Sequence, residues 1–308
     1  MKKLFTVTAA TALLCCALFS GCAPSGKIQG NYKEPTAEEL QTALSSVDSD
    51  EFFQPAQNGV YGFDLYADVT YSSRQGNLLT EYHIKAEYSF SAQFEEENAL
   101  PVLSGEGNLS LKVTLPDETA DGGKVVNELE ATLCNDSEFM YADGWMREGT
   151  EEKKTIKNKY PVSAESFLQD SDSTDLLPPD MDSAVAQFDL TELIGTLQQY
   201  NIEIGLDASD GVKLRFRANQ DTFAALAGTD TADGVSFQKD TMEAYLHIGS
   251  NGSLQGIAMN ADCVYTIGEG ETAQTISLGG VVSYSTTEKA VTAKIPDNPD
   301  DYTLDSFI

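Results

Sequence analysis

Apolar and polar side chains alternate along the chain from Glu81 to Phe94. The apolar ones all share one parity: Tyr82, Ile84, Ala86, Tyr88, Phe90, Ala92 and Phe94. Because a β-strand sends alternate side chains to opposite faces, this pattern predicts one strand with an apolar face and a hydrated face. At about 3.3 Å per residue the strand exceeds ~40 Å, and strands of that length belong to large curved sheets. A one-residue slip would bury Glu81, Lys85 and Glu87, so the register is fixed.

Shorter stretches with the same alternation flank this strand. They form a first run over about residues 59–157 and a second run over about 200–295, which ends in a strand at 291–295. Turn signals at Asp143-Gly144 and Asp210-Gly211 predict tight hairpins, because such dipeptides tolerate the positive φ angles of type I′ turns. We therefore expect the strands to pair with their chain neighbours in an antiparallel sheet with one dry face.

Two segments follow a helical period instead. Thr36 to Glu39 has the form of a capping box, and the apolar spacing after it predicts a helix over about 37–47. A helical interlude is expected over about 163–199, and its longest helix is marked by Leu190, Leu193, Ile194 and Leu197. The element order is helix, strands, helices, strands, which predicts an α+β fold with a large antiparallel sheet and few helices.

The N-terminus has the features of an export signal. A basic start, Met1-Lys2-Lys3, precedes an apolar stretch from Leu4 to Phe19, and small residues stand before Cys22. This arrangement resembles the signal sequence and lipobox of bacterial lipoproteins, which implies a diacylglycerol on Cys22. The lipobox departs from the family pattern in one respect, since Phe19 stands where the family prefers leucine.

The chain organisation that follows has a signal peptide at 1–21, a flexible tether at 22–35 and a single domain at 36–308. The tether is inferred from a short polar segment interrupted by Gly26 and Gly30. Beyond the signal, no stretch approaches the ~20 apolar residues that a membrane span needs. We expect an extracytoplasmic protein that is anchored to the bacterial cell membrane through its N-terminal lipid.

The formal net charge of the chain is −30, from 19 basic and 49 acidic residues. A surface this acidic repels phosphates, so nucleic acid is not an expected partner, and anionic lipid headgroups would not hold the body of the protein. The membrane is therefore expected as a partner only through the lipid on Cys22. The sequence identifies no protein partner.

The element order behind the lipobox resembles the LolA and LppX group of bacterial lipoproteins and lipid carriers, over roughly residues 36–295. The resemblance implies a strongly curved antiparallel sheet, an open half-barrel, with a few helices packed on its concave face. It also implies a cavity between sheet and helices that accepts acyl chains. The candidate lining residues are Tyr82, Tyr88, Phe90, Leu111, Trp145, Leu193 and Leu197. Judged by their pattern alone, the same side chains also fit an ordinary packed core.

The sequence holds none of the common nucleophile or zinc motifs. The two histidines, His83 and His247, fall on the polar parity of strands, as solvated side chains do. An acidic loop at 170–182 lacks the glycine and glutamate positions of an EF-hand calcium loop. Cys134 and Cys263 have parities that place them on opposite faces, which argues against a disulfide. We therefore expect a protein without enzyme activity, cofactor or metal.

Three functional hypotheses follow from these patterns. The first is a lipid-anchored lipoprotein that binds an apolar ligand such as an acyl chain, for carriage or sensing. The second is a surface interaction or structural lipoprotein with a filled core, whose acidic outer face meets a protein or wall partner. The third is a hydrolase that uses carboxylates alone, which strand parity disfavours because it scatters the acids over the hydrated face.

Overall fold

The structure, a computed structural model, describes residues 26–45, 59–94, 100–116, 124–162, 202–219, 222, 235–270 and 273–304. Its described helices are α2 (Ala37–Ser45) and the 3₁₀ helix η4 (Pro299–Asp301). The strands are β1 (Val60–Gln75), β2 (Leu78–Gln93), β3 (Val102–Pro116), β4 (Lys124–Asn135), β5 (Phe139–Glu148), β6 (Lys154–Pro161), β7 (Glu203–Asp207), β8 (Val212–Ala218), β9 (Val235–Ile248), β10 (Leu254–Ile267), β11 (Gln274–Thr287) and β12 (Thr303–Leu304).

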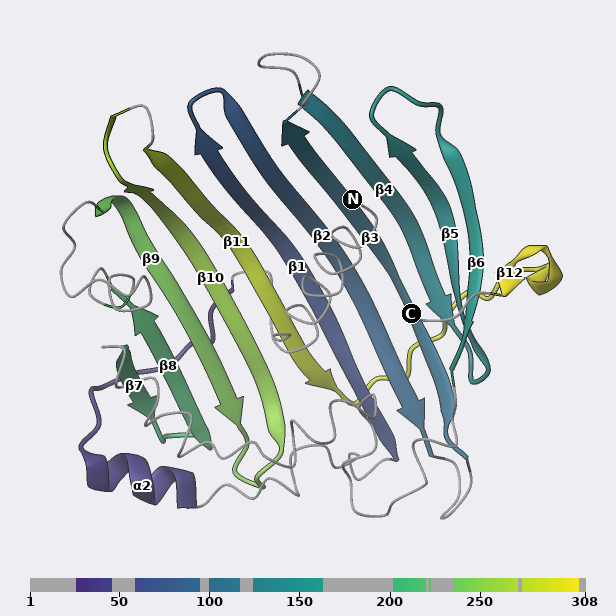
Figure 1. Cartoon of the computed structure of the whole chain (residues 1–308). Helices are drawn as coiled ribbons and strands as arrows, with labels where there is room; N and C mark the ends of the chain where they lie inside the picture. Colours follow the sequence, from purple (N-terminus) through teal and green to yellow (C-terminus); the bar gives the residue numbers. More distant parts are fainter. Residues whose placement is uncertain are drawn as a thin grey trace.

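All of these strands belong to one 12-stranded sheet, in the order β12-β6-β5-β4-β3-β2-β1-β11-β10-β9-β8-β7 (Figure 1). The sheet consists of two meanders, β1 to β6 and β7 to β11, in which each strand pairs with the next. β1 and β11 pair with each other and join the meanders. Neighbours are antiparallel except β12, which runs parallel to β6. The antiparallel sheet and its two predicted strand runs are confirmed.

The register of the ladders places most of the apolar side chains of these strands on one face, here called the apolar face. In β2, Tyr82 lies opposite Tyr71 of β1 and Val113 of β3. One row of paired residues crosses five strands: Ala67, Val282, Met259, Ala244 and Phe216. The opposite side, here called the polar face, carries residues of the other parity. The strand predicted from Glu81 to Phe94 is confirmed as the body of β2.

The sheet is open and is not strongly curled (Figure 1), so the predicted half-barrel is wrong. Curvature in antiparallel sheets comes largely from β-bulges and glycine kinks. In the described ladders, register shifts occur only between β9 and β10, after Leu254 and after Val264. The ladders from β11 through β1 to β6 keep one continuous register. The alternation of apolar and polar residues predicts the length of a strand, but it does not show whether the strand contains the bulges that would curve the sheet.

Helix α2 packs on the apolar face at the β7 end of the sheet. Leu40 and Leu44 join a buried cluster with Ile204, Val212, Leu214, Ile248, Leu254 and Tyr284. The predicted capping box is confirmed, because the Thr36 N–H donates to Glu39 Oε2 at 2.8 Å and the Glu39 N–H donates to Thr36 Oγ1 at 3.2 Å. The helical interlude predicted at 163–199 lies outside the described residues.

Residues 26–34, here called the N-terminal strap, run behind the sheet in Figure 1, along the polar face. Ile28 is buried against Tyr245 and Ala258. The Lys27 ammonium lies 3.2 Å from the Glu243 carboxylate. The strap continues to a backbone bridge between residue 33 and residue 206 on the edge strand β7.

The flexible tether predicted over 22–35 is therefore wrong for residues 26–34. Polar composition normally marks solvated linkers, but this segment binds a polar surface, so its own polarity helps it to pack. The Asn31 N–H donates to Asp207 Oδ2 at 2.7 Å, and the Tyr32 ring lies 5.7 Å from the Tyr245 ring. Such contacts depend on a long-range partner that composition does not reveal.

Residues 288–302, here called the C-terminal strap, cross the polar face toward β6 and lead into β12 (Figure 1). The Val291 N–H donates to Ser91 Oγ at 2.8 Å, and the Ala293 N–H donates to Ser104 Oγ at 3.0 Å. The strand predicted at 291–295 is wrong, since its backbone is bound by serine hydroxyls of the sheet and not by a strand ladder.

One predicted hairpin is confirmed and one is wrong. Gly211 has φ 69° in the tight turn between β7 and β8, as the Asp210-Gly211 signal predicts. Asp143-Gly144 lies inside β5, and the chain turns only at Gly149. A Cβ at Gly144 would come within 1.9 Å of the Glu130 carbonyl oxygen, so this glycine permits close approach of β4 and makes no turn.

Removal of the capping box should lower the free energy of unfolding by about 1 kcal/mol. Thr36→Ala deletes the hydroxyl that accepts the Glu39 N–H. Thr42→Ala is the matched control, because its hydroxyl donates within the helix to the Glu38 carbonyl at 2.7 Å. Urea unfolding should show a clear loss for Thr36→Ala and a smaller change for Thr42→Ala. Equal losses would contradict the capping role.

Docking of the N-terminal strap should weaken in acid through Asp207. Hydrogen bonds from the Ser209 side chain, the Asn31 backbone and the Ser209 backbone lower the pKa of this carboxyl from 3.8 to about 2. A depressed folded-state pKa adds stability above the unfolded pKa, and that stability is lost as the pH falls from about 4 toward 2. Over this range urea unfolding should show a smaller loss of stability in Asp207→Asn than in the natural protein.

Asp210→Asn serves as the control for this pH series, because Asp210 is 76% exposed and pairs only at the surface with Lys213 at 3.4 Å. Its acid sensitivity should match that of the natural protein. Parallel pH dependence in all three proteins would contradict the role of Asp207.

Candidate functional site

Aromatic side chains form a stacked row on the apolar face. Phe90 of β2, Phe63 of β1 and Tyr284 of β11 stand side by side, with ring centroids 5.2 Å and 5.4 Å apart. The Tyr61 and Tyr284 hydroxyls lie 3.0 Å from each other. Strand register produces the row, because Phe63 faces Phe90 in one ladder, and in the other ladder it faces Thr286, two residues from Tyr284 on the same face. The row offers a flat apolar wall with few hydrogen-bonding groups.

Four of the predicted lining residues share this face: Tyr82, Tyr88, Phe90 and Leu111. All four are partly buried. The Tyr88 hydroxyl donates to Asn135 Oδ1 at 2.5 Å, and burial raises the pKa of Tyr88. The Tyr82 ring lies 6.1 Å from Tyr71. The structure thus brings four predicted residues to one wall, while Leu193, Leu197 and the predicted lipid site Cys22 lie outside the described residues.

Trp145 is the predicted lining residue that the structure places elsewhere. It lies in β5 opposite Glu130 of β4 and Thr155 of β6, on the polar face. The Lys153 ammonium stands 3.3 Å from the centroid of its ring. The sequence misplaces Trp145 because it predicts a turn at Asp143-Gly144, which removes any constraint of strand parity.

Phe63, Tyr284 and Asn135 also belong to the apolar face, and none of them is among the predicted lining residues. The alternation around Phe63 and Tyr284 was visible in the sequence. Their contact depends on the β1–β11 pairing of two distant segments, for which local pattern gives no signal. Asn135 is a buried polar residue at a strand end, where its amide accepts a hydrogen bond from Tyr88 and donates one to the Asp136 carbonyl at 3.0 Å.

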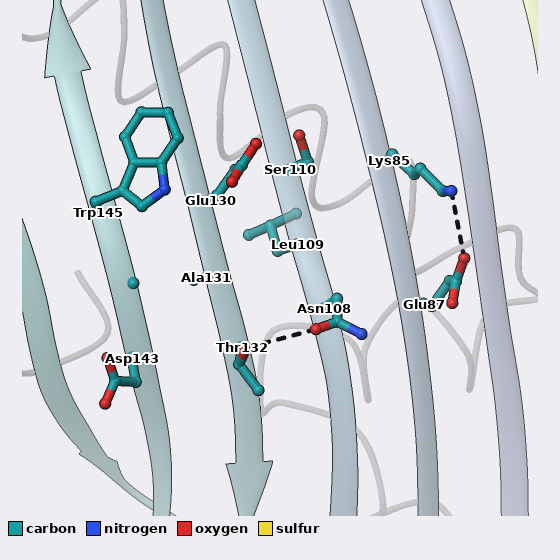
Figure 2. Close-up of a pocket in the computed structure, with 11 residues that line it drawn as sticks. Lys85, Glu87, Asn108, Leu109, Ser110, Glu130, Ala131, Thr132, Asp143 and Trp145 are labelled. Carbon is teal, nitrogen blue, oxygen red and sulfur yellow. Dashed lines mark hydrogen bonds and ion pairs between the residues drawn. The ribbon is translucent and has the colours of Figure 1, made fainter. Parts of the chain in front are cut away.

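The polar face carries an open groove across β2 to β5, with a volume of about 450 Å³ (Figure 2). Its walls are polar-parity side chains: Lys85, Glu87, Asn108, Ser110, Glu130, Thr132, Asp143 and Trp145. Its floor is formed by Leu109, Ala131 and Gly144, whose own parity faces the other side. Trp145 stands at one end of the groove and Lys85 with Glu87 at the other (Figure 2).

The described residues show no group of three or more side chains that could hold a metal ion. His83 lies on the polar face, 2.8 Å from Asp68, with both side chains well exposed. Burial and the nearby Lys213 lower the pKa of His247, which contacts the Asp210 carbonyl at 3.3 Å. Both histidines thus lie on the polar face, as predicted. Their contacts in the described residues are with Asp68 and with the Asp210 carbonyl, and neither of these is a hydroxyl or thiol nucleophile.

Cys134 and Cys263 are both buried and free, as predicted. Ladder register puts Cys263 on the apolar face beside Leu278, and Cys134 on the polar face beside Tyr141. Burial, followed by the nearby carboxylates of Asp136, Glu106 and Asp143, raises the pKa of the Cys134 thiol. A raised pKa keeps this thiol protonated and unreactive near neutral pH.

Comparisons with known proteins do not assign this chain to a family. No protein-family model matches it, and no curated protein matches it. One solved structure aligns weakly: the translocator domain of autotransporter NalP from Neisseria meningitidis. The sequence identity is 8%, the TM-score is 0.18, and the alignment covers 80% of this chain and 95% of that one. So low a TM-score carries no argument about fold or function.

Within the described part of the chain, no helix combines the length and the apolar character needed to cross a membrane.

The stacked row on the apolar face should show measurable coupling. In a double-mutant cycle of Phe63→Ala and Phe90→Ala, we expect an interaction free energy of about 0.5–1.5 kcal/mol, because stacked aromatic pairs add this much beyond burial. Urea unfolding measures the four proteins. A second cycle with Phe63→Ala and Tyr82→Ala is the control, since these residues are far apart along the ladder. Additive losses in both cycles would contradict the stacking.

Proposed function

We propose that the protein is an extracytoplasmic lipoprotein, attached to a membrane by a lipid on Cys22, whose apolar face binds an apolar ligand such as an acyl chain. The observation that carries the proposal is the one-sidedness of the sheet. Most of its apolar side chains share one face from β7 to β5, through register and not through local composition. Covering such a surface with an apolar partner is strongly favourable.

The described second layer on this face is small compared with the sheet. The cluster around α2 extends over β7 to β11 and ends at Phe63 of β1. Beyond it, β2 and β3 carry Tyr82, Ile84 and Leu111, which are partly buried. A wall of aromatic and aliphatic groups with few hydrogen-bond donors suits a hydrocarbon chain, which offers none in return.

The N-terminal strap supports the anchoring part of the proposal. Its first described residue, Gly26, stands over the polar face near Val281 and Met259. Cys22 precedes Gly26 by four positions, and a fully extended chain covers at most about 14 Å over that distance. A lipid on Cys22 would therefore hold the body close to the bilayer, although the acidic surface itself gains nothing from anionic headgroups.

A resemblance of element order to the LolA and LppX lipid carriers supports the same proposal, and the open sheet departs from the half-barrel of that group. The second candidate function, a surface interaction lipoprotein, is favoured by one specific observation. The polar face carries an open groove with a tryptophan and several hydrogen-bonding side chains (Figure 2).

Ligand binding can be tested with a fluorescent fatty acid and by mass spectrometry of lipid extracted from the purified protein. The proposal expects co-purified lipid and saturable uptake of the probe. Leu111→Asn, which places an amide on the apolar face, should weaken uptake at least about tenfold, or ~1.4 kcal/mol.

Lys112→Gln is the matched control on the opposite face of the same strand and should bind as the natural protein does. Lipid attachment is tested separately by labelled palmitate, which Cys22→Ser should not incorporate. Absence of both co-purified lipid and probe uptake would contradict the apolar-ligand proposal, whatever the outcome at Cys22.

A further inference from the structure

The polar-face groove lies on the side of the sheet away from the proposed apolar site, so what binds there is independent of that proposal. It crosses four strands, and at about 4.8 Å per strand spacing it extends some 14 Å. The groove is not an enclosed cavity, and its lining residues extend from Trp145 across the strands to Lys85 and Glu87 (Figure 2). A shape of this kind suits an extended chain that lies across strands better than a compact molecule.

Hydrogen-bonding groups of both kinds line the groove. Hydroxyls and an amide come from Ser110, Thr132 and Asn108, and the Thr132 hydroxyl donates to Asn108 Oδ1 at a long 3.5 Å. In the described residues, the Glu130 carboxylate and the Ser110 hydroxyl have no hydrogen-bond or ion-pair partner. The walls thus present both groups that can donate and groups that can accept, as recognition of a polyhydroxylated ligand requires.

Charges around the groove nearly cancel. Lys85 lies 3.5 Å from Glu87, and Asp143 accepts a hydrogen bond from the Tyr302 hydroxyl at 2.8 Å. Lys157 stands opposite Asp143 in the β5–β6 ladder. Glu130 also belongs to the lining, and the Lys153 ammonium lies over the ring of Trp145, which faces Glu130 in the β4–β5 ladder. The three carboxylates of the lining, Glu87, Glu130 and Asp143, are thus balanced by Lys85 and by two lysines at the border of the groove, so the groove has no strong preference for a cation or an anion, in spite of the acidic chain.

Trp145 is the one large apolar side chain in the walls of the groove, and it is the only tryptophan of the chain. Tryptophan combines a flat apolar ring with an N–H donor, so it can stack on an apolar ligand face and donate a hydrogen bond at its edge. In the described structure the Trp145 N–H has no acceptor. Its ring is covered by the exposed Lys153 side chain, which has no carboxylate partner there and can move aside.

We propose that this groove binds a neutral oligosaccharide chain, with Trp145 as the stacking platform. Sugar rings present apolar C–H faces and a rim of hydroxyls, which match the indole ring and the mixed donors and acceptors beside it. The chain lies across β2 to β5, from Trp145 toward Lys85 and Glu87.

The unique tryptophan reports directly on the site. Full-length protein is titrated with cellotetraose, with the N-acetylglucosamine tetramer and with the cationic glucosamine tetramer, while Trp145 emission is recorded. The proposal expects a saturable change with at least one neutral tetramer that persists from 50 mM to 500 mM salt. Absence of any change with neutral tetramers would overturn it. So would a response to the glucosamine tetramer alone that disappears in salt, because that is binding by charge.

Two variants sharpen this test, measured by calorimetry with the tetramer that binds. Trp145→Ala should weaken binding at least tenfold, and Trp145→Phe, which keeps a ring in β5, should weaken it less. Lys153→Ala uncovers the ring from an exposed loop without touching the sheet, and it should tighten binding several-fold. Thr70→Ala, on the polar face of β1 outside the groove, is the control. Unchanged affinity in both Trp145→Ala and Lys153→Ala would overturn the proposal.

Discussion

Strand register is the constraint on which the rest of this structure depends. Each ladder from β5 to β7 keeps the residues of one parity on one face, and most of the apolar residues have that parity, so the two faces of the sheet differ over its whole width. A slip of one residue in any single ladder would interrupt the apolar face and bury charges such as Lys85 and Glu87. The α2 cluster, the aromatic row and the polar groove all depend on this alignment.

The N-terminal and C-terminal straps both pack on the polar face of the sheet. The N-terminal strap binds β7 to β10 through Lys27, Ile28 and Asn31, and the C-terminal strap binds β2 and β3 through serine hydroxyls. Each strap also reaches one edge of the sheet, at residue 206 of β7 and at residues 158–159 of β6. Open edges invite pairing with other chains, so this partial cover limits aggregation of a very large sheet. The groove occupies polar surface on β2 to β5, apart from the serine contacts that hold the C-terminal strap.

Glu243 on the polar face is buried under the N-terminal strap, and its charge is compensated there. Burial under the N-terminal strap pushes the pKa of this carboxyl upward, but the bonds from Tyr245 and Lys27 outweigh it and leave the pKa lowered. The Tyr245 hydroxyl donates to Glu243 at 2.8 Å, and the Lys27 ammonium lies 3.2 Å away. Strap and carboxylate therefore stabilise each other, since neither charge is left unpaired.

Sequence pattern predicted much of the local structure and little of the long-range structure. Alternation located β2 and its parity, and the Thr36 to Glu39 motif located the start of α2. Pattern could not reveal that β1 pairs with β11, which creates the Phe63–Tyr284 contact. Pattern also predicted a turn at Gly144, where the glycine instead permits close approach of β4 and β5. It predicted a flexible linker over residues 26–34 from their polar composition, which does not reveal that a polar segment can bind a polar surface of the sheet.

The pairing of β1 with β11 is the part of this account that local pattern does not determine, and one cross-linking measurement tests it. Ser72 and Ser277 lie directly opposite each other in this ladder, whereas Ser72 and Leu278 face opposite sides of the sheet. Facing residues of antiparallel strands have Cα atoms about 4.5–5.5 Å apart, within the range of a disulfide. Mild oxidation should link the cysteines of Ser72→Cys/Ser277→Cys rapidly and leave those of Ser72→Cys/Leu278→Cys unlinked. The reverse order of rates, or no link in either protein, would contradict the register and the single apolar face built on it.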